Sequence, residues 1–110
     1  MIFLEARPRR VVHYVTADGK DAFDRWIKTL GRDSVLKKVL VRIDRAEDGN
    51  FGDCRAVGQG VWELKIDFGP GHRIYCAEDG EDLVLLTGGS KATQDSDIAR
   101  AKEYWSDYNA

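Results

Sequence analysis

One stretch of the sequence, VWELKIDFGPGHRIYC from Val61 to Cys76, alternates apolar side chains with side chains that titrate or carry charge. Apolar residues at every second position are typical of strands with one buried face. The intervening positions carry Glu63, Lys65, Asp67, Arg73 and Tyr75. Cations interleaved with an aromatic ring suit single-stranded RNA, because phosphates pair with the cations and bases stack on the ring. This face is therefore a candidate RNA-binding surface.

The hairpin register decides which of these side chains are neighbours. We predict a three-residue loop, Gly69-Pro70-Gly71, between the two strands. The resulting opposite pairs are Phe68–His72, Ile66–Ile74 and Leu64–Cys76 on the apolar face, and Asp67–Arg73 and Lys65–Tyr75 on the other. A one-residue slip would bury Arg73, so the apolar pattern excludes it. The alternative interpretation of the charged face is a solvated surface, on which an Asp67–Arg73 ion pair contributes only about 0.2–1 kcal/mol.

Three residues outside the hairpin extend the same predicted surface. Arg55 lies on a short neighbouring strand, and Lys91 follows Gly88-Gly89, where we expect a buried strand to break. Gln94 lies near the first turn of a last helix, and helix N-termini attract anions. We expect four cations to converge on one side of the sheet: Arg55, Lys65, Arg73 and Lys91.

The apolar periodicity predicts the elements that position these side chains. The first helix buries Ala22, Phe23, Trp26, Ile27 and Leu30 and ends at Gly31; the second is capped by Asp33 and buries Leu36, Val39, Leu40 and Ile43. The predicted strands are Val11–Val15, Cys54–Val57, Val61–Phe68, His72–Ala77 and a central Leu83–Leu86. A last helix, capped by Thr93 or Asp95, has the stripe Ile98, Ala101, Trp105 and Tyr108. This order predicts an α+β fold, a helical hairpin plus a C-terminal helix that cover one face of a largely antiparallel curved sheet.

Composition bounds the kind of protein. A chain of 110 residues with 43% hydrophobic and 33% charged residues predicts a single domain over residues 1–110. No apolar run approaches the roughly 20 residues of a membrane span, and the N-terminal apolar stretch is too short for a signal peptide, so we expect a cytoplasmic protein without a membrane partner. Cys54 and Cys76 show no metal-ligand spacing, and we expect reduced packing residues.

The charge balance gives no general support for a nucleic-acid partner. The net charge is −2 and the pI is about 5.7, whereas proteins that bind phosphates mostly carry a basic excess. RNA binding therefore requires a local patch. We interpret the basic residues of the second helix as a solvated face: Lys37, Lys38, Arg42 and Arg45.

Two segments together carry a resemblance to a known family. GNFGDCRAVGQGVWELKIDFGPGHRIYC and LVLLTGGSKATQDSDIARAKEYW resemble the phage-derived, HigB-like branch of the RelE/ParE toxin superfamily. Members have basic residues at the positions of Arg55 and Lys65, an arginine at Arg73, and a lysine after paired glycines at Lys91. The chain departs from the pattern at His72, where a tyrosine is usual, and at Glu63, where RelE has a lysine.

The resemblance implies a RelE/ParE-like fold and the toxin of a type II toxin–antitoxin pair. Relatives of the RelE and HigB type cut messenger RNA, commonly on the ribosome, without a metal, and no small-molecule cofactor is implied. The partner implied is a helix-turn-helix antitoxin. Two alternatives stay open: a non-enzymatic gyrase inhibitor of the ParE type, and an inactive relative that only binds its antitoxin.

Cleavage of this kind gives each candidate residue a role. Arg73 would stabilise charge on the phosphoryl group, since a guanidinium donates at two points. Lys65 and Lys91 would hold flanking phosphates, and a lysine crowded by cations could also exchange the proton. Arg55, Gln94 and Glu63 would contact the RNA, Tyr75 would stack on a base, and Glu63 or His72 are alternative bases.

Overall fold

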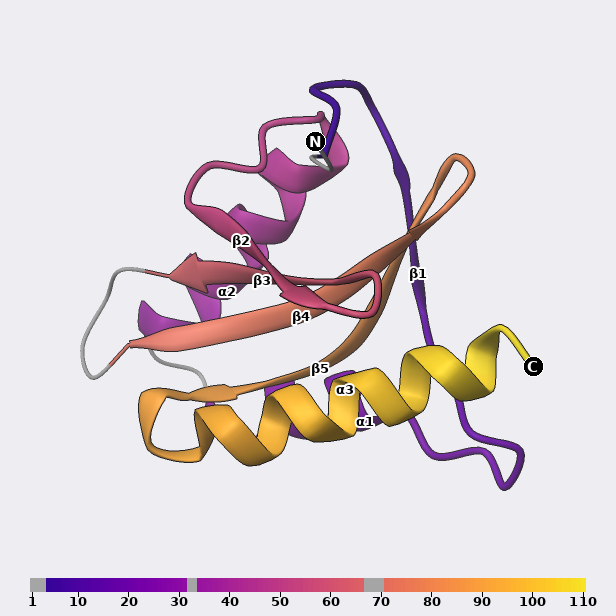
Figure 1. Cartoon of the computed structure of the whole chain (residues 1–110). Helices are drawn as coiled ribbons and strands as arrows, with labels where there is room; N and C mark the ends of the chain where they lie inside the picture. The colour runs from indigo at the N-terminus through magenta and orange to yellow at the C-terminus, as the bar shows by residue number, and fades with distance from the viewer. Residues whose placement is uncertain (1–3, 32–33, 67–70) are drawn as a thin grey trace.

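A computed structural model describes residues 4–31, 34–66 and 71–110 of the chain. The elements are β1 (Arg10–His13), α1 (Ala22–Thr29), α2 (Ser34–Glu47), β2 (Cys54–Gly58), β3 (Val61–Ile66), β4 (His72–Asp79), β5 (Asp82–Ser90), a short 3₁₀ helix (Lys91–Thr93) and α3 (Gln94–Tyr108). The strands form one sheet in the order β1-β5-β4-β3-β2, in which β1 runs parallel to β5 and every other pair is antiparallel. The predicted α+β architecture is confirmed (Figure 1).

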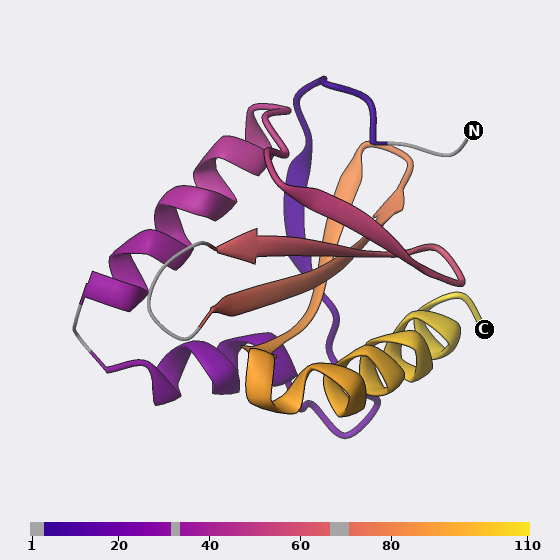
Figure 2. The same cartoon turned by 60° about the vertical axis from the view of Figure 1, so that its left-hand side comes forward.

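The helices cover both faces of the sheet rather than one. Helices α1 and α2 lie on one side, and α3 crosses the other, as Figures 1 and 2 show. The prediction that all helices share a face is wrong for α3. The physical reason lies in β5, which is apolar on both faces: Leu83 and Leu85 pack beneath α1 and α2, while Val84 and Leu86 pack with Ala101 of α3. A strand of this kind needs cover on both sides.

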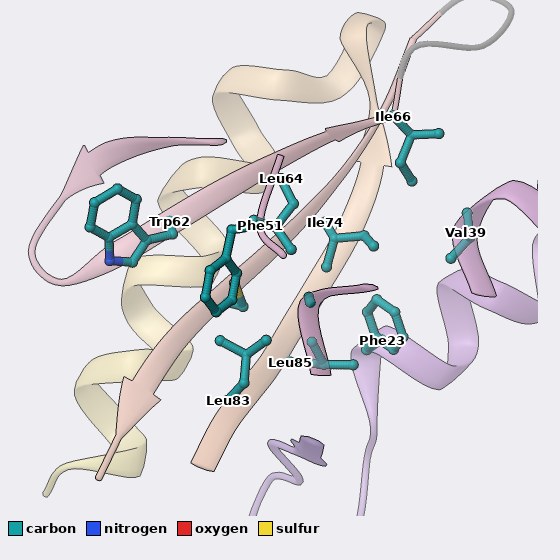
Figure 3. Close-up of a cluster of buried hydrophobic side chains, with 11 residues drawn as sticks. Phe23, Val39, Phe51, Trp62, Leu64, Ile66, Ile74, Leu83 and Leu85 are labelled. Atoms are coloured by element: carbon teal, nitrogen blue, oxygen red, sulfur yellow. The ribbon is translucent and has the colours of Figure 1, made fainter. Parts of the chain in front are cut away.

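The larger core cluster fills the space between the sheet and the helical hairpin (Figure 3). Phe23 of α1 and Val39 of α2 are fully buried against the apolar face of β3, β4 and β5. Both cysteines are free, and Cys76 is part of this cluster, as the packing interpretation predicted. Leu40 of α2, predicted to be buried, is 46% exposed. The predicted cap Asp33 lies outside the described residues.

The β3–β4 register differs from the prediction by two residues. Ile66 lies opposite His72, Leu64 opposite Ile74, and Trp62 opposite Cys76. On the reverse face Lys65 lies opposite Arg73 and Glu63 opposite Tyr75. The predicted pairs were wrong because a two-residue slip keeps every side chain on its own face, so the apolar pattern does not detect it. Asp67 and Phe68 lie outside the described residues.

Strand β5 continues through Gly88 and Gly89, where a break was predicted, and ends at Ser90. Both glycines serve close packing. A Cβ at Gly88 would collide with the Trp26 indole of α1, and a Cβ at Gly89 would collide with the Asp97 carboxylate of α3. The pair therefore lets a helix approach the strand on each face, and Lys91 begins the 3₁₀ helix beyond it. None of the helices in the described ranges is long and apolar enough to cross a membrane.

We predict that Gly88→Ala destabilises the protein by about 1–3 kcal/mol, the usual cost of forcing extra atoms into a packed site. Urea denaturation of both proteins measures the difference. The control is a double-mutant cycle with Trp26→Ala, in which Gly88→Ala should cost clearly less because the colliding indole is gone. Additive losses in the cycle would contradict the packing explanation.

Candidate functional site

The candidate site lies on the sheet face that carries α3, where two rows of side chains run across the strands. In the first row, Arg55 of β2 lies opposite Glu63 of β3, which lies opposite Tyr75 of β4. In the next row, Lys65 lies opposite Arg73. Cross-strand partners point to the same side of a sheet. The antiparallel pairing of β2, β3 and β4 therefore gathers residues that are up to 20 positions apart in the chain.

The Glu63 carboxylate is the centre of the first row. The side chain is buried, and three donors surround it. Arg55 donates from Nε to Oε1 at 2.8 Å, Tyr75 donates from its hydroxyl to Oε2 at 2.9 Å, and Gln94 donates from Nε2 to Oε2 at 3.0 Å. The carboxylate thus joins β2, β3, β4 and the first residue of α3.

These contacts set the protonation states of the acid and the phenol. Burial acts to raise the pKa of Glu63, but the hydrogen bonds from Arg55, Gln94 and Tyr75 outweigh burial and hold the pKa below its ordinary value. Burial and the hydrogen bond to Glu63 both raise the pKa of Tyr75. At neutral pH, Glu63 is therefore a carboxylate and Tyr75 a neutral phenol.

Arg73 is the guanidinium of the site with unused donors. Its Nε lies 3.7 Å from Oε2 of Glu63, which makes an ion pair but no hydrogen bond. Its side chain is only 9% exposed, and neither Nε nor Nη1 has a hydrogen-bond partner among the described residues. Buried polar groups are nearly always paired, so the two unpaired nitrogens make Arg73 a candidate contact for an anion in the cavity that it lines.

The cavity holds about 260 Å³ and is lined by Asp53, Arg55, Glu63, Lys65, Arg73 and Gln94. Lys65 is exposed and forms no ion pair within the described ranges, so its ammonium is available at the rim. Five of the seven residues predicted for the site thus line one cavity.

Lys91 lies just outside this cavity. Its main-chain N–H donates to the carbonyl of Gly71 at 3.0 Å, which ties the start of the 3₁₀ helix to the start of β4. A Cβ at Gly71 would lie 3.3 Å from Nη1 of Arg73 and 4.0 Å from Cβ of Lys91. Lys91 is exposed and borders a neighbouring hollow together with Gln94. Arg73 and Lys91 are therefore neighbours across Gly71.

These positions correct the expected roles of Tyr75 and Glu63 and the expected exposure of Arg73, and they place His72 as a packing residue rather than as a base. Tyr75 is fully buried, so a base cannot stack on its ring. Glu63 is surrounded by donors and has a lowered pKa, which makes it a poor proton acceptor. His72 lies on the opposite face, where its ring packs edge-on at 6.4 Å from Trp26, as expected for a packing residue. Arg73, expected on an exposed face, is 8% exposed because α3 covers this part of the sheet.

The sequence interpretation also missed the burial of Arg42 and Asp97. Arg42, which we interpreted as solvated, is 9% exposed, and its guanidinium donates to the carbonyls of Lys65, Phe51 and Asp53. It lies three residues after Val39 in α2, so helical spacing alone indicates its buried face. Asp97 in the first turn of α3 is also buried and accepts from the Thr93 hydroxyl at 2.6 Å. Asp97 lies four residues before Ala101, so helical spacing indicates its position on the buried side as well.

The described residues contain no group of three or more His, Cys, Asp or Glu side chains that could hold a metal ion. The cationic and amide groups that line the cavity are the guanidinium groups of Arg55 and Arg73, the ammonium of Lys65 and the amide of Gln94. Such groups bind and stabilise phosphoryl oxygens.

Comparison with known proteins gives three similarities. The chain matches the family model described as phage-derived protein Gp49-like (DUF891) over residues 25–105, which include every candidate residue. An uncharacterized protein of Haemophilus influenzae is 44% identical over 81 residues, 73% of this chain and 82% of the relative. The solution structure of the conserved hypothetical protein HP0894 from Helicobacter pylori is similar with a TM-score of 0.50 and 22% identity, covering 76% of this chain and 96% of that one. At this identity the likeness concerns the fold alone, and that fold is RelE-like.

We predict that Glu63→Gln lowers the free energy of unfolding by about 1–3 kcal/mol at pH 7, because Arg55 and Arg73 lose the buried charge between them. A folded-state pKa below the ordinary 4.5 means that the carboxylate stabilises the protein above about pH 4.5, and that this contribution is lost as the pH falls through the lowered pKa. Denaturation at a series of pH values should therefore show that the free energies of unfolding of Glu63→Gln and the wild type approach each other at acidic pH.

Tyr75→Phe is the matched control, since it removes one donor and leaves the charge. Tyr75→Phe should lower the free energy of unfolding less than Glu63→Gln does, and its stability should still fall at acidic pH as that of the wild type does. If the stability difference between Glu63→Gln and the wild type does not change with pH, the ionised carboxylate is not what holds the row together.

Proposed function

This chain belongs to the Gp49-like family of phage-derived proteins (DUF891), a family in the RelE-like group of toxin-like proteins, and from this premise we propose that it is the toxin of a type II toxin–antitoxin pair. In this proposal it belongs with the HigB-like branch and is a metal-independent endoribonuclease. It cuts messenger RNA on the ribosome in the cytoplasm and thereby stops translation. Its partner is a helix-turn-helix antitoxin.

The observation that carries the proposal is the state of Arg73. A buried guanidinium with unpaired Nε and Nη1, beside a cavity of about 260 Å³ with Lys65 at its rim, is suited to a phosphodiester. A guanidinium offers several N–H donors in a fixed plane, which suits the oxygens of a phosphoryl group better than a single ammonium does. Most buried donors are satisfied by the protein, and Arg73 keeps two that are not satisfied by any described residue.

The reaction that fits these groups uses the RNA's own 2′-hydroxyl. The hydroxyl loses its proton and its oxygen attacks the adjacent phosphorus, the bond from phosphorus to the 5′-oxygen breaks, and that oxygen takes up a proton. The products are a 2′,3′-cyclic phosphate and a 5′-hydroxyl. Negative charge grows on the two non-bridging oxygens, and Arg73 stabilises it.

Lys65 and Lys91 bind the phosphates on either side of the cleaved bond. Both are exposed, and they flank Arg73, one across the strand pair and one across Gly71. Arg55 and Gln94 are held by Glu63 at the cavity wall, where their remaining donors contact the RNA. Lys65, with its mobile ammonium, is the first candidate for proton transfer.

Sequencing of cellular RNA ends after brief induction in a bacterial host tests the proposal. We expect new 5′ ends within translated messages and a rapid loss of protein synthesis. A DNA-damage response with intact messages would favour gyrase as the target, and normal growth at full protein level would leave an inactive antitoxin-binding relative.

We predict that Arg73→Lys lowers the cleavage rate by about 10²–10³-fold, because one ammonium replaces a two-point donor. Lysine keeps the charge beside Glu63, so the fold should survive, and thermal denaturation checks this. The matched control is Arg10→Lys, at an arginine with a 76% exposed side chain on edge strand β1, which should leave cleavage unchanged. Full growth arrest by Arg73→Lys at equal protein level would refute the role of Arg73.

A further inference from the structure

The row of side chains that holds Lys65 and Arg73 has a third member, Asp53. The main-chain N–H of Lys65 donates to the carbonyl of Asp53 at 3.0 Å, so the residue before β2 is still paired with β3. Asp53 lies two residues before Arg55, whose side chain faces the site, and alternate residues along a strand share a face. Asp53 accordingly lines the same cavity as Lys65 and Arg73.

The main chain of Asp53 is held in place, whereas its carboxylate is not. Besides the bond from Lys65, the Asp53 carbonyl accepts from Nη2 of the buried Arg42 at 3.1 Å. The residue is exposed, and its carboxylate forms no hydrogen bond or ion pair with any residue in the described ranges. The fold therefore presents an unpaired acid at the rim of a cavity that is otherwise lined by three cations, an amide and the engaged Glu63.

The proposed cleavage requires a group that accepts the proton of the 2′-hydroxyl, and the residues considered so far do not supply one. Glu63 already accepts three hydrogen bonds, and His72 lies on the other face of the sheet. Charged lysine and arginine side chains are donors without a lone pair, and the amide of Gln94 is not a base. Among the groups that line the cavity, the carboxylate of Asp53 is the one suited to this step.

We propose that Asp53 is the general base of the cleavage, an inference that rests on the proposed function. Its carboxylate takes the proton of the 2′-hydroxyl while that oxygen forms its bond to phosphorus. The ammonium of Lys65 gives a proton to the 5′-oxygen while the bond from that oxygen to phosphorus breaks. Afterwards Asp53 releases its proton to water and Lys65 takes one up, so the cycle consumes no further reactant.

The order of the row suits this division of labour. The attacking and the leaving oxygen lie on opposite sides of the phosphorus atom, so the base and the acid must flank it. Side chains opposite each other on neighbouring strands have Cβ atoms about 4.5–5.5 Å apart, which lets Asp53 and Lys65 reach the two oxygens of one phosphate. Arg73, the next member of the row, donates to the non-bridging oxygens from the cavity wall.

A carboxylate without a chemical role would have the opposite effect on the reaction. Its negative charge repels the phosphates that the neighbouring cations attract, so its removal would strengthen RNA binding and leave the cleavage rate unchanged or higher. The base and the passive acid therefore differ in the sign of the effect on the cleavage rate, which makes the charge-neutral variant of Asp53 decisive.

The test is single-turnover cleavage of a short message on purified ribosomes by the full chain, at the bond that RNA-end sequencing identifies. Asp53→Asn keeps the main-chain bonds and the size of the side chain and removes the proton acceptor. The matched control is Asp95→Asn, which removes the same charge at an exposed residue of the hollow beside Lys91. A second substrate carries sulfur in place of the 5′-oxygen at the cleaved bond, because a leaving thiolate needs no proton.

We expect Asp53→Asn to lower the cleavage rate at saturating toxin by about 10²–10⁴-fold on both substrates, while the half-saturating concentration stays equal or falls. Asp53→Ala should show the same loss, with thermal denaturation confirming that both variants are folded. Asp95→Asn should cleave within about twofold of the wild type.

The inference is overturned if Asp53→Asn cleaves as fast as the wild type, or if the control loses as much activity as Asp53→Asn does. It is also overturned if the sulfur substrate restores the rate of Asp53→Asn, because Asp53 would then act on the leaving group. Normal cleavage by Asp53→Asn refutes the base alone, whereas a wild-type chain that leaves every message intact refutes the proposed function and the base together.

Discussion

The site depends on one buried negative charge. Glu63 points from the middle of the sheet into the layer under α3, where an ionised carboxylate is stable only with donors around it. Arg55, Tyr75 and Gln94 supply them from β2, β4 and α3. The carboxylate thereby fixes the N-terminus of α3 against the sheet. It also attracts Arg73 at 3.7 Å without accepting a hydrogen bond from it, so Arg73 keeps donors that have no partner among the described residues.

Much of the fold followed from the sequence because periodicity reports which face a side chain occupies. The strands and helices were predicted within a few residues, and the two faces of the β3–β4 hairpin were assigned correctly. Two features escaped this signal. A register slip of two residues preserves both faces, and a polar residue such as Glu63 looks solvated until α3 is known to lie above it. Both depend on tertiary contacts rather than on local pattern.

The sequence identified most of the residues that line the cavity, but it did not show what each of them does there. Arg55, Lys65, Arg73 and Gln94 do line one cavity, as cations and an amide on one face should. The sequence does not reveal that Glu63 and Tyr75 are buried supports, whereas Arg73 is buried with two nitrogens that have no hydrogen-bond partner among the described residues. Arg42 is a different case: helical spacing indicates its buried face, but a charged residue in mid-helix is solvated in most proteins, and here three carbonyls make its burial favourable.

The distribution of ion pairs explains how an acidic chain can present a surface for anions. The arginines of the N-terminal segment and β1 are paired with acids of β4, β5 and the turn between them, including Glu78 and Asp82, so this end of the sheet is nearly neutral. The opposite end, where β3 stops and β4 and the 3₁₀ helix begin, holds Lys65, Arg73 and Lys91, and among the described residues only Arg73 of these three forms an ion pair, with Glu63. Screening in salt limits the reach of exposed charges to about 8–10 Å. A ligand at this end therefore encounters the local cations, and the net charge of the chain has little influence on its binding.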